Sequence, residues 1–428
     1  MTCFPAALVL LAAGAFCALL TGRRSDLASL IGTLSSVGGG LLALAAAWPV
    51  LAGGRELTWS APWRVPAGVF ALRLDPLAAW FVLPIALLGI CCALFGASYL
   101  RGEGKSRSLA PHWFHYNLLL AAMLLVATAA NAVLFLAAWE IMTLTSFFLV
   151  AWDHRHTEAR QAAWLYLLAA HCGLMLLLAL FLEAGVYCGS FNFAAFTPLG
   201  QLPAANAAGF FLLALFGFGV KAGLLPLHIW LPDAHPAAPS HISALMSGVL
   251  VKTGIYGLLR ILTLLPPAPA WWGWLLAGLG GLGALYGIAL ACLQQDIKRC
   301  LAYSTIENVG IIFLGLGFGL VAQAQGHPAI ALLAFAGGML HIWNHALFKG
   351  LMFLGAGALV HATGTRNMNR MGGLLRRMPL TGLLWIGGSL AISALPPLNG
   401  LISEWRSTSA CCRPACCRPT SSPCRRCS

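Results

Sequence analysis

Long apolar segments separated by short polar ones run along almost the whole chain. A helix needs about 20 apolar residues to cross the hydrocarbon core of a bilayer, because lipid offers no partner to backbone groups and an α-helix satisfies its own. The pattern therefore predicts an all-α polytopic membrane protein with about 12 transmembrane helices. The predicted spans are residues 4–20, 29–51, 76–98, 115–131, 132–152, 162–184, 206–230, 241–263, 271–292, 301–322, 329–360 and 380–404.

Prolines interrupt two of these predicted spans. Pro226, in the seventh, has no N–H to donate to the carbonyl of Ala222, and its ring clashes there. Pro396 and Pro397 interrupt the twelfth span in the same way. Paired breaks of this kind point to a transport site near the bilayer midplane, as in transporters built from inverted repeats.

The last part of the chain has a different composition. Residues 405–428 contain repeated Cys-Cys-Arg-Pro, with no apolar run and no helical period. Such a stretch is not expected to complete a membrane helix. We therefore expect an aberrant tail here, produced by truncation or by a shifted reading frame.

The composition excludes a soluble globular protein. The chain has 428 residues, of which 60% are hydrophobic and 9% are charged. About a quarter of the residues of an ordinary soluble domain are charged. The net charge of +13 does not indicate binding to nucleic acid, because the Lys and Arg residues lie in short loops rather than on one face.

The positions of the Lys and Arg residues predict the orientation of the chain. They concentrate in the loops that follow the odd-numbered spans. Positively charged loops resist translocation, so we expect these loops on the cytoplasmic side and the N-terminus outside. The predicted location is the inner membrane of a bacterial-type cell.

Nothing in the apolar body indicates a bound metal or another cofactor. Of the 14 cysteines, eight are scattered through the apolar segments and six lie in the last eighteen residues. The eight show no spacing typical of a disulfide framework, a zinc site or a redox motif. We therefore expect no cofactor and no metal.

Among the charged residues inside predicted spans, the foremost are Glu140 in the fifth, Lys221 about one helical turn before Pro226, and Lys252 in the eighth. A charge at the centre of a membrane helix costs roughly 3 kcal/mol on insertion scales, so each is a candidate for function. Glu140 and Lys221 together could hold and release a proton as their separation changes. The alternatives are a fixed structural ion pair for Glu140 and lysines that extend to the membrane interface.

A stripe of ionisable residues follows in the eleventh span. His341, His345 and Lys349 are each four residues apart, which places them on one helix face at intervals of about 6 Å along the axis. Neutral histidines pass protons between their two ring nitrogens, so the stripe predicts part of a proton path. A histidine in a span is otherwise most often a core residue. Glu404, beyond the break in the twelfth span, is a further candidate.

Four other residues are candidate accessories to such a path. His228 and His235 flank the break in the seventh span, where they either line a cavity or lie at the interface. Asp296 and Lys298 lie in a predicted cytoplasmic loop, where they are either accessory groups or ordinary solvated charges.

Residues 221–260, 294–310 and 344–379 resemble a known family. The family comprises the antiporter-like proton-translocating membrane subunits of respiratory complex I, of multisubunit cation/proton antiporters and of membrane-bound nickel-iron hydrogenases. These three passages are most similar to its hydrogenase-4 and formate hydrogenlyase branch. The resemblance covers nearly all of residues 75 to 405.

The resemblance implies a fold of about 14 helices in two inverted repeats, with helices 7 and 12 broken. In that fold Glu140 and Lys221 form a pair, Lys252 is the central lysine, the stripe in the eleventh span connects it to the far side, and Glu404 is the terminal residue. The implied domains are N-terminal helices in 1–114, a first repeat in 115–263, an incomplete second repeat in 271–404 and the tail in 405–428.

From the residues and the resemblance we predict a membrane subunit that moves protons, is driven by a redox partner and has no redox centre of its own. The expected partners are other membrane subunits, a peripheral nickel-iron hydrogenase or quinone oxidoreductase arm, and the lipid bilayer; nucleic acid is not among them. Two alternatives stay open. One is a cation/proton antiporter subunit, in which Na⁺ uses similar residues, and the other is a non-conducting membrane scaffold.

Overall fold

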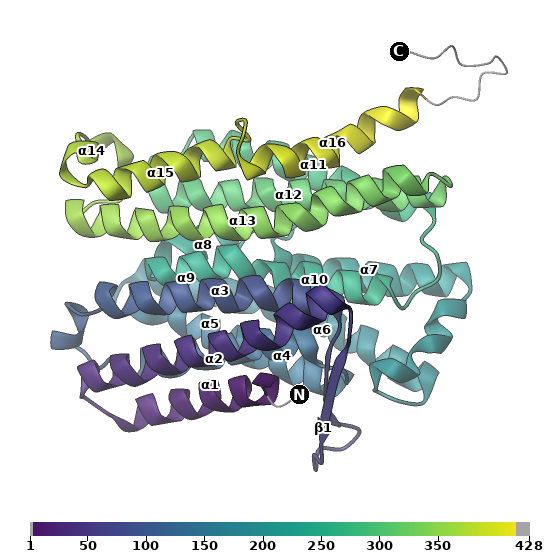
Figure 1. Cartoon of the computed structure of the whole chain (residues 1–428), viewed down its shortest axis with the longest axis horizontal. Helices are drawn as coiled ribbons and strands as arrows, with labels where there is room; N and C mark the ends of the chain where they lie inside the picture. Colours follow the sequence, from purple (N-terminus) through teal and green to yellow (C-terminus); the bar gives the residue numbers. More distant parts are fainter. Residues whose placement is uncertain (1–2, 417–428) are drawn as a thin grey trace.

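A computed structural model describes residues 3–416. Long helices lie side by side with nearly parallel axes, and a β-hairpin projects at one end of the bundle (Figure 1). A π-helical turn, Met246–Leu250, joins α9 to α10. The helices and strands are α1 Cys3–Leu20, α2 Ser25–Gly53, β1 Leu57–Ala61, β2 Phe70–Leu74, α3 Pro76–Tyr99, α4 Ala110–Thr128, α5 Ala132–Val150, α6 Thr157–Cys188, α7 Ala204–Ala222, α8 Leu231–Ala237, α9 Ser240–Leu245, α10 Val251–Leu262, α11 Ala270–Cys292, α12 Ile297–Ala324, α13 Pro328–Thr363, α14 Leu374–Arg377, α15 Pro379–Ile392 and α16 Asn399–Cys416.

The helices confirm the predicted all-α membrane fold. Within residues 3–416, ten helical spans are long and apolar enough to cross a membrane. Two of the twelve predicted spans are not among the ten. One is α4, which contains the polar residues His112, His115 and Asn117. The other is the twelfth, which the structure divides into α15 and α16.

Both predicted helix breaks are present. Helix α7 ends at Ala222 because Gly223 adopts a left-handed conformation, with φ of 74°, and its N–H bonds back to the last turn. The helix therefore stops before Pro226 and does not run to residue 230 as the predicted span did. In the twelfth span, residues 393–398 separate α15 from α16.

The helix α16 corrects the prediction for the start of the tail. We expected no helix after residue 405, but α16 continues to Cys416. Tertiary packing accounts for the difference, because the buried Ser403 and Ser407 lie on the side of α16 that meets α13. The Oγ of Ser407 approaches Gly337 of α13, where a larger residue would collide with it. The rest of the predicted tail, residues 417–428, lies outside the described residues.

The loops that follow α1, α3, α5, α11 and α13 meet at one end of the bundle. Ser25 at the start of α2 donates to the carbonyl of Arg107, and Arg107 donates to the carbonyl of Trp152. Farther along the chain, the Nε of Arg366 lies 3.4 Å from the Oδ2 of Asp296. These are the loops in which the sequence concentrates Lys and Arg, so the positive loops share one end.

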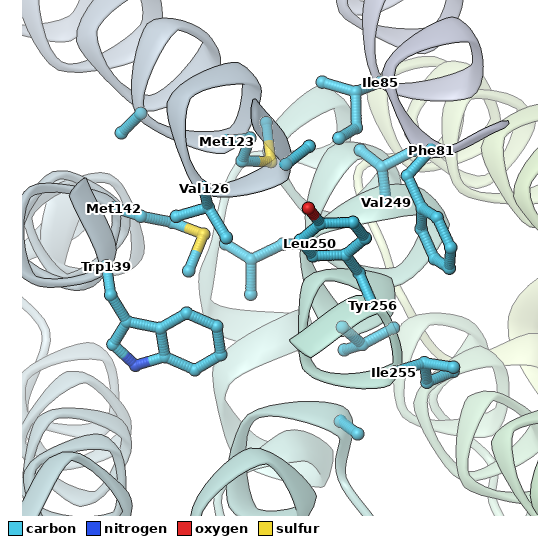
Figure 2. Packing of buried hydrophobic residues seen from close by; sticks show 14 of the residues in the cluster. Phe81, Ile85, Met123, Val126, Trp139, Met142, Val249, Leu250, Ile255 and Tyr256 are labelled. Atoms are coloured by element: carbon cyan, nitrogen blue, oxygen red, sulfur yellow. The ribbon is translucent and has the colours of Figure 1, made fainter. Parts of the chain in front are cut away.

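An apolar cluster holds the central helices together (Figure 2). The rings of Phe81 and Tyr256 meet edge to face with centroids 5.3 Å apart. Thr253 of α10 lies 3.6 Å from the sulfur of Met142 of α5. The first contact holds α3 against α10, and the second holds α5, which contains Glu140, against α10, which contains Lys252. The labelled members of the cluster are Phe81, Ile85, Met123, Val126, Trp139, Met142, Val249, Leu250, Ile255 and Tyr256.

The opposite end of the bundle has a charge cluster that the sequence did not predict. The hairpin of β1 and β2 ends at Asp75, whose side chain accepts a hydrogen bond from the N–H of Ala78 and so caps α3. Both nitrogens at the tip of the Arg260 guanidinium donate to the same carboxylate. Burial raises the pKa of Asp75, but the hydrogen bonds and charge of Arg260 lower it more, and the resulting pKa lies below the usual value.

Replacing Asp75 with asparagine is expected to destabilise this end of the fold. The new amide oxygen would still cap α3, but Arg260 would lose its counter-ion, at a cost of up to about 3 kcal/mol. Because the pKa is lowered in the folded state, the carboxylate stabilises the wild type fully above about pH 4 and loses this effect as pH falls through the folded pKa. Thermal unfolding in detergent at pH 7 and pH 3 measures both effects. Equal melting temperatures of variant and wild type at pH 7 would contradict the prediction.

Candidate functional site

Lys221 lies in the last turn of α7, just before the helix break. Only 2% of the residue is exposed. Its Nζ donates to the Oγ1 of Thr143 on α5 at 3.0 Å and to the hydroxyl of Tyr166 on α6 at 2.6 Å. A cation is favoured at this end of a helix, because the last carbonyls carry partial negative charge. The break therefore helps to hold an ammonium group between three helices.

Glu140 does not form the predicted ion pair with Lys221. Its partner within 4.0 Å among the described residues is His171 of α6, whose Nε2 lies 3.2 Å from Oε1. The side chains of Glu140 and His171 are 29% and 38% exposed, so the pair is half-buried on the outer face of α5 and α6. Glu140 still interacts electrostatically with Lys221. Glu140 points away from Lys221, whereas Thr143, three residues farther along α5, contacts that lysine.

Lys252 lies directly after the π-helical turn and is also 2% exposed. Its Nζ donates to the carbonyl of Ser247 and contacts Nδ1 of His345 on α13. With the ammonium as donor, Nδ1 is the acceptor and the ring proton of His345 lies on Nε2. Nε2 is buried and has no hydrogen-bond partner among the described residues. The predicted central lysine and the predicted stripe are therefore in direct contact.

The stripe in α13 is buried and lies on one face, as predicted. His341, His345 and Lys349 each have no exposed surface. The two histidine rings are nearly parallel, with centroids 6.3 Å apart. Lys349 donates to the hydroxyl of Ser304 and to the carbonyl of Leu301 on α12, the latter at 3.1 Å.

The stripe reaches the second helix break. Nδ1 of His341 lies 2.9 Å from the hydroxyl of Ser403 on α16, and Nε2 lies 3.1 Å from Oδ1 of Asn308 on α12. Asn344 donates to the carbonyl of Asn399 at 2.8 Å. The start of α16, just after the prolines, is thus bound to the stripe by side-chain hydrogen bonds.

Glu404 lies one residue beyond Ser403, in α16. It is half-buried and interacts electrostatically with Glu307 of α12. Glu307 also interacts electrostatically with Lys349. Two carboxylates, Glu307 and Glu404, therefore lie near the stripe, whereas the sequence analysis had identified only Glu404.

The accessory candidates fall into two groups. His235 is fully buried and His228 is 7% exposed, so both lie inside the protein rather than at a surface. Lys298 is 4% exposed and donates to the carbonyl of Ala238 at 2.8 Å. Asp296 instead caps α12 and forms a partly exposed ion pair with Arg366. Of the two loop residues, only Lys298 is close to the interior groups.

Several residues of this site were missed from the sequence. Thr143 and Tyr166 gave no signal, because hydroxyl side chains are common in membrane helices and satisfy themselves on their own helix. His171 and Glu307 did give one, since each is an ionisable residue inside a predicted span. The π-helical turn beside Lys252 has no sequence signature, although such turns are frequent at functional sites.

Comparison with known proteins places this arrangement in a family. Residues 129–413 match the family described as NADH:quinone oxidoreductase/Mrp antiporter, TM. Hydrogenase-4 component B of Escherichia coli (strain K12) is 47% identical over 337 residues, which are 78% of this chain and 50% of that protein. Formate hydrogenlyase subunit 3 of the same organism is 33% identical over 395 residues, which are 92% of this chain and 62% of that protein.

Solved structures show the same fold. A chain of the membrane-bound sulfane sulfur reductase, an archaeal respiratory membrane complex, superposes with a TM-score of 0.82 and 30% sequence identity. The superposition covers 95% of this chain and 64% of that one. The chain spans between about half and two thirds of the length of these relatives.

Proposed function

This chain belongs to the NADH:quinone oxidoreductase/Mrp antiporter transmembrane family and is a multi-pass membrane protein, and from this premise we propose that it is a proton-translocating membrane subunit of a redox-driven complex. The observation that supports the proposal most is the direct contact between Lys252 and His345. It joins Lys252, in the first half of the chain, to the buried stripe of α13. In an apolar protein, such a connected row of ionisable groups is costly unless protons or ions use it.

The proposed path begins at Lys221 and continues through Lys252 to the stripe. A shift of Glu140 towards Lys221 would favour the protonated lysine, and its return to His171 would release a proton towards Lys252. From Lys252 the proton would pass to His345, and then to His341 or Lys349. Groups coupled this closely titrate together rather than one by one. Glu307 and Glu404 are the proposed acceptors at the far end.

The half-buried pair of Glu140 and His171 suits contact with another membrane subunit. The Oε2 of Glu140 has no hydrogen-bond partner among the described residues, and the pair lies on an outer face that lipid would otherwise cover. A neighbouring subunit would cover the exposed atoms of the pair, whereas Oε2 itself is buried within this chain. We further propose a peripheral nickel-iron hydrogenase or quinone oxidoreductase arm as the redox partner, with the positive loops on the cytoplasmic side.

Proton flux through the chain in reconstituted vesicles tests the proposal. Lys221→Ala removes the ammonium held by Thr143 and Tyr166, and Glu140→Gln removes the charge that shifts it, so each is expected to lower the flux by about tenfold or more. Glu183→Gln is the matched control, because Glu183 is an exposed carboxylate on α6, away from the site. Unchanged flux in both site variants would contradict the proposed function.

A cation/proton antiporter subunit is the second candidate, because the matched family includes the Mrp antiporters. The two functions differ in their need for a second cation. Flux that requires Na⁺ on the opposite side of the vesicle, and stops when choline replaces it, supports the antiporter. A wild-type chain that conducts neither ion would favour a non-conducting scaffold.

A further inference from the structure

A pair of buried histidines lies outside the path described above. His112 of α4 and His241 of α9 have no exposed surface, and their Nε2 atoms are 2.9 Å apart. The two rings come from residues 129 positions apart in the chain. Neither belongs to the stripe of α13 or to the contacts of Lys221.

The pair is tightly enclosed by aromatic rings and by a glycine. Trp152 packs on His112 with ring centroids 4.8 Å apart, and Tyr99 packs on His241 at 5.7 Å. Gly96 of α3 faces His241, and a Cβ added there would lie 2.9 Å from Cδ2 of the ring. The backbone of α3 therefore approaches the imidazole as closely as a glycine allows. Such packing holds the two rings against each other.

The hydrogen bonding of the pair requires different tautomers. A contact of 2.9 Å between two ring nitrogens needs one Nε2–H donor and one bare Nε2 acceptor. In the donor ring Nδ1 is then a bare acceptor, and in the acceptor ring Nδ1 bears a proton. Both Nδ1 atoms are buried without a partner among the described residues. One end of the pair can accept a proton while the other end donates one.

The two ends of the pair face different parts of the protein. On the side of His112, Trp152 donates to Glu103, a carboxylate of the loop after α3, at 2.9 Å. On the side of His241, Lys298 of α12 interacts electrostatically with the ring. Arg107, His115 and Tyr116 are other titratable groups near His112.

His235 of α8 is a further buried histidine, and its ring centroid lies 5.7 Å from that of Phe353 on α13. Both of its ring nitrogens are buried without a partner among the described residues. It interacts electrostatically with Lys298, Lys349 and Lys252. Buried polar nitrogens of this kind are normally satisfied, and ordered water satisfies them where protein does not. His112, His241 and His235 therefore share buried ring nitrogens that ordered water would satisfy.

We propose that His112 and His241 form a proton relay, which connects the end of the bundle at Glu103 through His235 to Lys252 and Lys349. In each step a proton reaches the bare Nδ1 of one ring, the Nε2 proton crosses to the other ring, and the Nδ1 proton of that ring leaves. Rotation of each ring away from its partner, followed by proton exchange with water on its own side, restores the first tautomers without reversing the transfer. The inference rests on the proposed function, because it supplies protons to the path proposed above.

Solid-state NMR of the full chain in lipid bilayers tests the geometry of the relay. With ¹⁵N-labelled histidine, the two Nε2 nitrogens are expected to couple through one N–H···N bond, and magnetisation from water is expected to reach both Nδ1 nitrogens. His112→Gln and His241→Gln assign the signals. Uncoupled rings, or Nδ1 nitrogens that water does not reach, would overturn the inference whether or not the chain conducts protons.

Proton flux in vesicles tests the use of the relay. His112→Gln and His241→Gln keep polar side chains of similar length but cannot exchange tautomers, and each is expected to lower the flux by about tenfold. His115→Gln is the matched control, because His115 lies on the same helix but stacks on Phe148 at 4.6 Å instead. Normal flux in both relay variants, with flux lost in Lys252→Met, would overturn the relay alone. A wild-type chain without flux would contradict the proposed function and the relay together.

Discussion

Replacing Lys252 with methionine is expected to abolish proton flux through the chain, with a fall of at least about 100-fold. Methionine has nearly the same length and fills the same buried volume, but it has no proton to transfer. The substitution removes the donor that contacts both the carbonyl of Ser247 and Nδ1 of His345. Because the position is only 2% exposed, no group from the solvent can enter the variant and replace the ammonium.

The stability of the same variant separates a role in transport from a role in folding. A buried lysine without a close carboxylate is costly to the folded state, so Lys252→Met is expected to unfold at the same temperature as wild type or higher. Lys105→Met, in the loop after α3, is the matched control and should change neither property. Flux within twofold of wild type in the Lys252 variant would exclude it from the path. A lower melting temperature would instead show that Lys252 is needed for folding.

Local sequence patterns predicted most of the fold because each span satisfies its own backbone hydrogen bonds. The length of an apolar segment is then sufficient to place a helix, and α11 and α13 lie within a few residues of their predicted ranges. The breaks were predictable for a similar reason, since the effect of Pro226 and of Pro396 on a helix is local. The stripe in α13 follows from a spacing of four residues on a single helix.

Contacts between helices were less predictable, because they depend on how each helix is rotated about its axis. Glu140 and Lys221 were expected to pair, but Thr143, three residues farther along α5, faces Lys221 instead. The pair of His112 and His241 was missed for the same reason, since no spacing connects residues of two distant helices. Helix α16 extends past residue 405 because Ser403 and Ser407 pack on α13, a contact that composition does not indicate.

The packing of α11 on α12 leads to the second prediction, that Gly310→Val prevents the chain from folding. The two helices meet at glycines, and the backbones approach so closely that a Cβ added to Gly310 would lie 2.4 Å from the carbonyl oxygen of Gly280 and 2.5 Å from the nitrogen of Ala284. Both obstacles are backbone atoms, which cannot move aside as a flexible side chain does. Overpacking of a core position costs roughly 1 to 3 kcal/mol or more, and a branched side chain enlarges the clash.

Gly278→Val gives the matched control, because the same substitution on α11 meets open space. Gly278 is exposed, and no atom lies within 4 Å of an added Cβ. Both variants place a β-branched residue inside a helix, so helix propensity changes equally and only the contact between α11 and α12 differs. We expect monodisperse protein from Gly278→Val and aggregated or degraded protein from Gly310→Val in detergent extracts. Equal yields and melting temperatures for the two variants would mean that α11 does not pack on α12 as described, and the positions of Ser304, Asn308 and Glu307 on α12 relative to the path would then need to be redrawn.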